Sequence, residues 1–191
     1  MIIRIHRSDG QVGRYSQTSA AAQAMLIRRL DPATIFVSGP IAVGRGNPLS
    51  LLSPDHICWI EVETDLTTLR NARPGIDTVV RLKDADEYRD LLATQWPRWM
   101  KHPRTDPGDP FEAFVELSML GGCVLHFRVT GRITNLSISE AIYGPPALTA
   151  SFGSNGTIYV NPKAIVRARI YHSHTAIETP HGLWAADADD I

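Results

Sequence analysis

Histidine and aspartate residues gather near the C-terminal end of the sequence, beginning with the run Tyr171-His172-Ser173-His174. His172 and His174 are two residues apart, so in a strand they project from the same face. Imidazole and carboxylate groups bind zinc, and such a site could activate water for a metal-dependent hydrolysis. The spacing matches no established ligand motif, and chain termini are commonly loose, so we favour a solvated tail. The other candidate ligands are His181, Asp187, Asp189 and Asp190.

The remaining candidate nucleophiles and cofactor loops have simpler structural interpretations. Ser173 lacks the G-x-S-x-G turn that positions a catalytic serine. Cys58 and Cys123 lie in apolar strand patterns, so we expect both to be buried core residues in a reducing compartment. The glycine-containing run 43–48 lacks the lysine and the following hydroxyl residue of a phosphate-binding loop. The sequence therefore predicts no cofactor.

Aromatic and basic residues alternate between Trp96 and Arg104, around Trp99. Such a surface could stack on nucleic-acid bases or contact a protein partner. Two tryptophans near the end of a helix more often anchor that helix on a neighbouring element. We favour the anchor and keep a partner contact through Trp96 and Trp99 as the alternative.

The composition is that of a globular protein without a strong global charge. Hydrophobic residues make up 43% and charged residues 20% of the 191 residues, and the formal net charge is −1. Binding to nucleic acid would therefore need a local basic patch. A basic face of this kind would consist of Arg128, Arg132, Arg167 and Arg169.

The N-terminal residues alternate in polarity and then reach a turn, unlike the apolar stretch of a signal peptide. No run approaches the roughly 20 apolar residues of a membrane-spanning helix. These features predict a cytoplasmic protein that does not engage a membrane.

Two segments of the sequence resemble each other without a gap: residues 51–62 and residues 159–170. In both, an apolar run meets a small polar residue and a proline, Ser53-Pro54 or Asn161-Pro162, and an alternating strand pattern follows. Proline cannot donate a ladder hydrogen bond and forces the preceding residue toward extended geometry. Each pair should therefore end one strand and redirect the chain into the next.

The resemblance divides the chain into two similar units. We expect β-rich units at residues 1–65 and 111–174, a helical insertion and proline-rich linker at 66–110, and a flexible acidic tail at 175–191. The predicted fold class is α+β, with two tandem small antiparallel β-sheet units, each with one helix, joined by the helical insertion.

Turn and capping signals place the individual elements. In the first unit, Asp9-Gly10 predicts a hairpin and Asp31-Pro32 ends a helix. In the second unit, Gly121-Gly122 corresponds to Asp9-Gly10. Pro97 should end or kink the helix of the insertion. The predicted strands are 2–7, 11–15, 33–37, 77–82, 114–119, 123–129 and 148–152, and the predicted helices are 18–30, 84–99 and 137–144.

Alternation along the two similar strands assigns their faces. We expect Cys58, Ile60 and Val62 to be buried, as are Val166, Ala168 and Ile170 in the second copy. The outward residues are then Trp59 and Glu61 in one strand and Arg167 and Arg169 in the other. Their opposite charges could face each other or bind different partners, although solvated sheet faces are the simpler interpretation.

These features favour a non-catalytic adaptor or regulatory protein that presents β-sheet faces to a protein partner. The candidate contact residues are Trp59, Glu61, Arg167, Arg169, Trp96 and Trp99. A nucleic-acid-binding protein using the arginine face is the first alternative, and a metal-dependent hydrolase using His172 and His174 is the second. A homo-oligomer is also compatible with the sequence.

Overall fold

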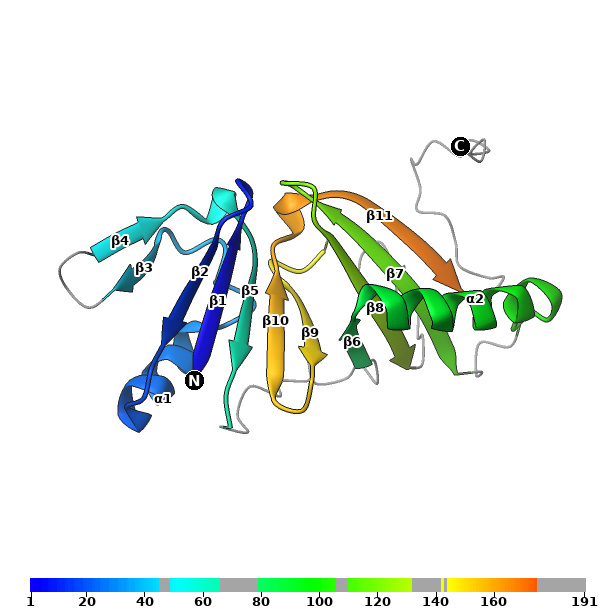
Figure 1. Ribbon diagram of the computed structural model, residues 1–191, viewed down its shortest axis with the longest axis horizontal. Coiled ribbons are helices and arrows are strands. Elements are labelled where there is room, and N and C mark those ends of the chain that lie inside the picture. The colour runs from blue at the N-terminus through cyan, green and yellow to red at the C-terminus, as the bar shows by residue number, and fades with distance from the viewer. Residues whose placement is uncertain (45–48, 66–78, 106–109, 132–141, 143, 175–191) are drawn as a thin grey trace.

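The computed structural model describes residues 1–44, 49–65, 79–105, 110–131, 142 and 144–174 (Figure 1). These residues form one nine-stranded mixed sheet, a separate two-stranded sheet and two α-helices. The predicted fold class of two tandem small antiparallel units, each with its own helix, is therefore wrong. Strands from both predicted units belong to a single large sheet, and the separate two-stranded sheet comes from the first unit alone.

The nine-stranded sheet has the order β11-β7-β8-β6-β9-β10-β5-β1-β2. Neighbouring strands are antiparallel except β6 and β9, which are parallel. The small sheet pairs β3 with β4 and lies apart at one end of the molecule (Figure 1). The bounds are β1 Ile2–Arg7, β2 Val12–Ser16, β3 Ile41–Gly44, β4 Leu49–Leu52, β5 Ile57–Glu63, β6 Val79–Lys83, β7 Phe111–Met119, β8 Val124–Gly131, β9 Leu148–Phe152, β10 Gly156–Val160 and β11 Ile165–His172.

The two predicted units merge because β10 pairs with β5. Their register runs from Gly156 opposite Glu63 to Val160 opposite Trp59. Hydrophobic alternation predicts that each segment is a strand, but it does not specify which distant strand becomes its neighbour. The sequence therefore located both strands correctly and missed the pairing that joins them.

The two similar segments form the same local structure. Each contains a strand, a single 3-10 turn that begins with the proline, and a second strand. The turns are η1 (Pro54–His56) and η3 (Pro162–Ala164). The predicted role of the two prolines, to end one strand and redirect the chain, is confirmed.

Asn161 connects the two 3-10 turns. Its side chain is buried, with the residue only 1% exposed, and Nδ2 donates to the carbonyl oxygens of Pro54 at 3.0 Å and Ile57 at 2.9 Å. Oδ1 accepts from the backbone N–H of Lys163, and the backbone N–H of Asn161 donates to the Cys58 carbonyl. One amide side chain thus satisfies carbonyl groups of the N-terminal half from a position in the C-terminal half.

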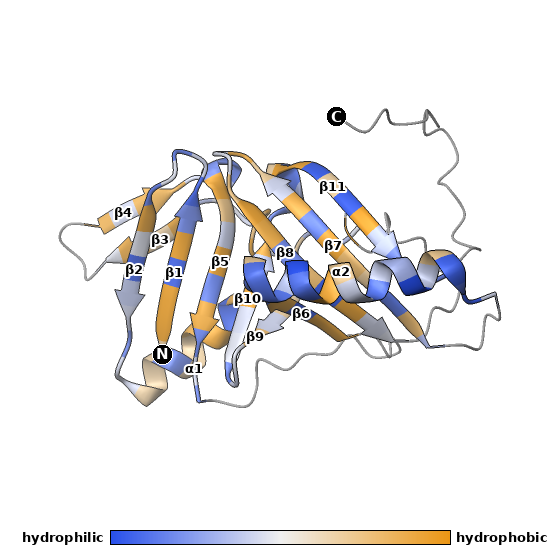
Figure 2. Cartoon of the chain, turned by 45° about the vertical axis from the view of Figure 1, so that its right-hand side comes forward, coloured by the Kyte–Doolittle hydropathy of each residue, from blue (hydrophilic) through white to orange (hydrophobic). Residues whose placement is uncertain are grey.

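Two large hydrophobic cores lie on opposite faces of the sheet. One contains Ile5, Ile60 and Val62 and packs β1 and β5 against Phe36 and the β3–β4 sheet. The other contains Leu117, Phe127 and Ile158 and lies among β7, β8 and β10. Figure 2 shows the alternating apolar and polar bands along the strands that feed these cores. The sheet face that a hydrophobic core covers therefore changes between β5 and β10.

Both predicted helices within the described residues are present. α1 (Ala20–Arg29) has Ser19 as its N-cap, and α2 (Ala85–Lys101) has Asp84 as its N-cap. Pro97 lies inside α2 and does not end it, and Trp99 in the last turn is buried against β7. The predicted helix at 137–144 falls largely outside the described residues.

The predicted strand at 33–37 is wrong. These residues form turns, and Ile35 and Phe36 are buried in the core beneath β1 and β5. A short apolar run shows that residues are buried, but it does not distinguish a strand from a buried turn.

Neither helix in the described part of the chain combines the length and the apolar content that crossing a membrane requires. The expectation of a chain without a membrane-spanning helix agrees with this finding.

Replacing Asn161 with alanine should lower the free energy of unfolding by about 2–4 kcal/mol, because the buried Ile57 carbonyl and the partly buried Pro54 carbonyl lose their donor. Urea unfolding measures this loss. Asn155 is the control, because it is exposed and, within the described residues, its side-chain amide bonds to the Asp65 side chain. Asn155→Ala should cost under about 1 kcal/mol. Equal losses in both variants would show that the Asn161 contacts contribute no more to the free energy of unfolding than those of Asn155.

Candidate functional site

Two groups of three strands share the same pairing pattern. In the N-terminal group, β1 lies between β2 and β5, and in the C-terminal group, β7 lies between β8 and β11. Arg4 of β1 is opposite Arg14 and Glu61, and Glu116 of β7 is opposite His126 and Arg169. Residues 2–16 therefore correspond without a gap to residues 114–128.

This correspondence explains why Glu61 and Arg169 have opposite charges. Arg4 Nη1 lies 3.3 Å from Glu61 Oε2, and Glu116 Oε1 lies 3.9 Å from Arg169 Nη1. The acid and the base have exchanged strands between the two groups, and each group keeps a complementary pair. Glu61 and Arg169 were predicted as partner contacts, and the structure places a neighbour of opposite charge beside each.

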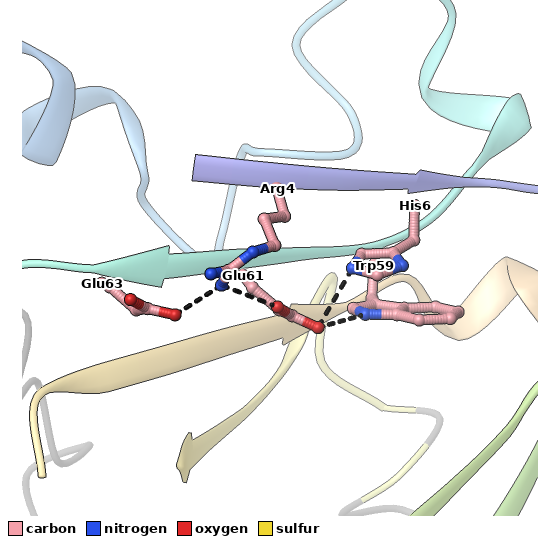
Figure 3. Close-up of polar contacts among 5 residues, drawn as sticks. All are labelled: Arg4, His6, Trp59, Glu61 and Glu63. Atoms are coloured by element: carbon pink, nitrogen blue, oxygen red, sulfur yellow. Dashed lines mark hydrogen bonds and ion pairs between the residues drawn. The ribbon is translucent and has the colours of Figure 1, made fainter. Parts of the chain in front are cut away.

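A polar network surrounds Glu61 on the outward face of β1 and β5 (Figure 3). Its carboxylate accepts from Arg4 and, at 3.1 Å, from Trp59 Nε1. His6 Nε2 lies 3.0 Å from Glu61 Oε1, although this nitrogen has no well-aligned hydrogen bond among the described residues. Arg4 also binds Glu63. Every charged member of this network therefore has a partner of opposite charge or a donor.

The environment of Glu61 favours its ionised form. Burial alone would raise the pKa of this carboxyl group, but contacts from His6 and Trp59 and the charge of Arg4 outweigh it and lower the pKa. A carboxylate held in this way is a weak proton acceptor. The network is therefore suited to fixing the positions of β1 and β5 rather than to acid–base catalysis.

Trp59 does not face solvent as predicted. It is 6% exposed, its ring stacks on His6 with centroids 4.1 Å apart, and it packs in the core beneath β10. The reason is the change of covered face between β5 and β10, which buries residues on both sides of β5. Trp59 therefore exposes too little surface in this structure to make a large contact with a partner.

Trp96 and Trp99 lie on the side of α2 that contacts the C-terminal group. Trp99 stacks on Phe114 with ring centroids 5.3 Å apart, and Trp96 meets Tyr171 edge-on at 5.2 Å. These contacts support the favoured hypothesis that the tryptophans anchor the helix. Trp99 is buried, whereas Trp96 remains partly exposed.

The arginine face contains carboxylates as well as cations. Arg128 lies 2.8 Å from Glu112, and Arg167 and Arg169 both lie near Glu116. Arg167 and Arg169 are exposed, as predicted. Arg132 lies outside the described residues. The described part of this face is therefore less positive than its arginines alone suggested.

His172 and His174 do not form a metal site with other described residues, among which no group of three or more potential ligands occurs. His174 Nδ1 lies 3.2 Å from Ser173 Oγ. Burial lowers the pKa of His172. The further candidate ligands His181, Asp187, Asp189 and Asp190 lie outside the described residues.

The two cysteines differ in exposure. Cys58 is buried, and burial raises the pKa of its thiol, which disfavours the reactive thiolate. Cys123 is exposed in the β7–β8 turn, so the prediction that both are core residues is wrong for Cys123. The prediction that Val166 is buried is also wrong, because Val166, at a register irregularity between Ile165 and Arg167, is 64% exposed.

The most distinctive open feature is the free edge of β2. In the C-terminal group, β8 is covered by β6, which in turn contacts β9. The corresponding strand β2 ends the nine-stranded sheet, and no described strand pairs with its outer edge. Beside it is an open hollow of about 180 Å³, lined by Ile5, Arg7, Gln11, Val12, Gly13, Tyr15 and Leu52. We take the edge of β2 and this hollow, together called the β2 site, as the candidate functional site.

The size of the hollow limits what can occupy it. Pockets for cofactors and drug-sized ligands usually measure about 300–1,000 Å³, whereas a cavity of about 150 Å³ holds one benzene. The hollow has space for about one large side chain. Its position beside an unpaired strand favours a side chain carried by another strand.

Comparison with protein-family models, curated proteins and solved structures finds no match for this chain. The assignment of the site therefore rests on its geometry.

Sequence reasoning missed the β2 site, although a signal for it existed. The match between the two hairpins, centred on Gly10 and Gly122, identifies β2 with β8. Both glycines have positive φ, 80° and 83°, which favours glycine at these turn positions. Following this match would have shown that β6 and α2 precede the second hairpin in the chain.

Glu61→Gln should reduce stability near neutral pH and have little effect in acid. Because the folded-state pKa of Glu61 is depressed, its contribution is present above the unfolded-state pKa of about 4.3 and is lost as pH falls through the folded-state value. The urea midpoints of the unmodified protein and the Glu61→Gln variant should therefore converge as the pH is lowered from 7 to 3. Asp55→Asn, at a highly exposed side chain, should show no such convergence. A constant gap at all pH values would contradict the assignment.

Trp99→Ala should destabilise the protein by roughly 3–5 kcal/mol, because it removes a buried ring from between α2 and β7. Trp96→Ala, at a partly exposed ring, should cost less. Thermal and urea unfolding test both variants. An unchanged melting temperature for Trp99→Ala would instead identify the tryptophans as a contact surface.

Proposed function

We propose that this protein is a non-catalytic adaptor that binds an extended segment of a protein partner at the β2 site. The observation that carries the proposal is the outer edge of β2, which no strand of the described residues covers. β6 fills the corresponding position beside β8, where it pairs antiparallel from Val79 opposite Thr130 to Lys83 opposite His126. A partner strand would lie antiparallel to β2, as β6 lies against β8.

The backbone of β2 offers hydrogen-bonding groups along this edge. Gln17 and Met1 bond each other, and Arg7 N–H donates to Gln11, so these pairs face inward toward β1. In an antiparallel ladder the intervening residues direct their N–H and C=O groups away from the partner strand. Val12, Arg14 and Ser16 therefore present their backbone groups to an added strand.

Side chains around the edge indicate the chemistry of the partner. One face of an added strand would meet the hollow beside Gly13, where Ile5 and Leu52 offer apolar contacts next to the polar Arg7 and Gln11. The opposite face would meet Arg14, which is exposed and has no acidic partner among the described residues. A segment that alternates apolar and acidic residues fits both faces.

The proposal is tested with a six-residue peptide of alternating valine and glutamate, blocked at both ends. Titration into the ¹⁵N-labelled protein should shift the amide signals of Val12, Arg14 and Ser16 first. Arg14→Pro removes one outward N–H and should weaken binding about tenfold. Ala168→Pro, at the opposite edge strand β11, should leave it unchanged. Absence of shifts up to millimolar peptide, or equal loss in both variants, would contradict the proposal.

A further inference from the structure

A second open position lies at the other end of the nine-stranded sheet, beside β11. Both three-strand groups run in the same order along the sheet, β11-β7-β8 and then β5-β1-β2. The outer edge of β5 is covered by β10. The corresponding strand β11 has no strand on its outer edge within the described residues.

The strand that corresponds to β10 is β4, and it is also incompletely paired. β10 precedes η3 and β11 as β4 precedes η1 and β5. β4 pairs only with β3 among the described strands, and its side chains Leu49 and Leu51 are exposed. The molecule thus has an open β4 and an open β11 at opposite ends (Figure 1).

Corresponding positions differ sharply in burial. Leu51 is 63% exposed, whereas Tyr159, its counterpart in β10, is 2% exposed. Val166 is 64% exposed, whereas Cys58, its counterpart in β5, is fully buried. These positions are buried where β10 and β5 meet and exposed where β4 and β11 have no counterpart to meet. β4 and β11 therefore carry apolar side chains at the positions that are buried where β10 pairs with β5, but β4 and β11 do not pair within one molecule.

We propose that β4 of one copy of this chain pairs with β11 of a second copy, and so repeats the β10–β5 junction between molecules. Transfer of the β10–β5 register places Leu51 opposite Ala168, Ser50 opposite Arg169 and Leu49 opposite Ile170. Leu49 and Leu51 then cover Ala168 and Ile170, which are only partly buried at the edge of the larger core.

The backbone of β11 supports this register. Ser173 N–H donates to Glu112, so alternate residues Arg169 and Tyr171 face β7 with their backbone groups. Ala168 and Ile170 therefore direct their N–H and C=O groups outward, toward the place of the second copy.

The proposed contact joins two unlike surfaces, so it is head-to-tail and produces a ring or an open chain of molecules. It leaves β2 open and does not depend on the proposed function.

Paired cysteine variants test the register directly. Ser50 and Arg169 correspond to Ile158 and Glu61, which lie opposite each other in β10 and β5. The pairs on either side of Ile158 and Glu61 are hydrogen-bonded, so these two residues form a closely spaced pair without backbone hydrogen bonds between them. A disulfide fits the roughly 4.5 Å Cα separation of such a pair. Both variants also carry Cys123→Ser, because Cys123 is exposed. Under mild oxidation, a mixture of Ser50→Cys and Arg169→Cys should form a disulfide-linked dimer at least about tenfold more than either variant alone.

A second measurement uses surface variants and needs no crosslink. Sedimentation velocity of the unmodified protein should show association that increases with concentration, and Leu51→Glu should abolish it. Met25→Glu is the matched control, because Met25 is 62% exposed on α1, away from both strands. A monomer at all concentrations would overturn the proposal, as would equal loss in the Met25 variant. Crosslinking of Ser50→Cys alone would also overturn it, because it indicates pairing of β4 with β4.

Discussion

The pairing of β10 with β5, held at one end by Asn161, is the interaction on which the rest of this structure depends. Without it, β5 would be an edge strand and the sheet would separate into two pieces. Asn161 is the only side chain in the described residues that donates to both the Pro54 and Ile57 carbonyls. Its hydrogen bond to the Ile57 carbonyl is buried, so water cannot readily take its place there. The joined sheet can then bury a core on each of its faces.

The two ends of this sheet are completed unequally. The segment between the two groups supplies β6, which covers β8, and α2, which covers β7 with Tyr88 and Trp99. No described element performs either task for β2 and for the outward face of β1. That face instead holds the network in which Arg4 pairs with both Glu61 and Glu63. The unequal completion leaves the outer edge of β2 without a neighbouring strand among the described residues.

Much of the local structure could be predicted from the sequence. The hairpins at Asp9-Gly10 and Gly121-Gly122, the N-cap of each helix and the proline turns follow from short-range stereochemistry. Burial of Ile60 and Val62 follows from alternation along β5. These features depend on residues close together in the chain, so a single sequence carries enough information about them.

The remaining features depend on distant contacts. The burial of Trp59 requires β10 on one side of β5, and nothing near Trp59 in the sequence indicates that strand. The pairing of Arg4 with Glu61 and of Glu116 with Arg169 becomes visible only when both strand registers are known. The β2 site is harder still, because it is defined by a neighbouring strand that the N-terminal group lacks in the described part of the chain.

Amide hydrogen exchange measures most directly whether the sheet is continuous at β5 and open at β2. The N–H groups of Ile60 and Val62 bond across to β10 in this account, so they should exchange only through global unfolding. Those of Val12, Arg14 and Ser16 should exchange fast, because they face the open edge. The account is contradicted if the β5 amides exchange as fast as edge groups, or if the three β2 amides are as protected as those of β5.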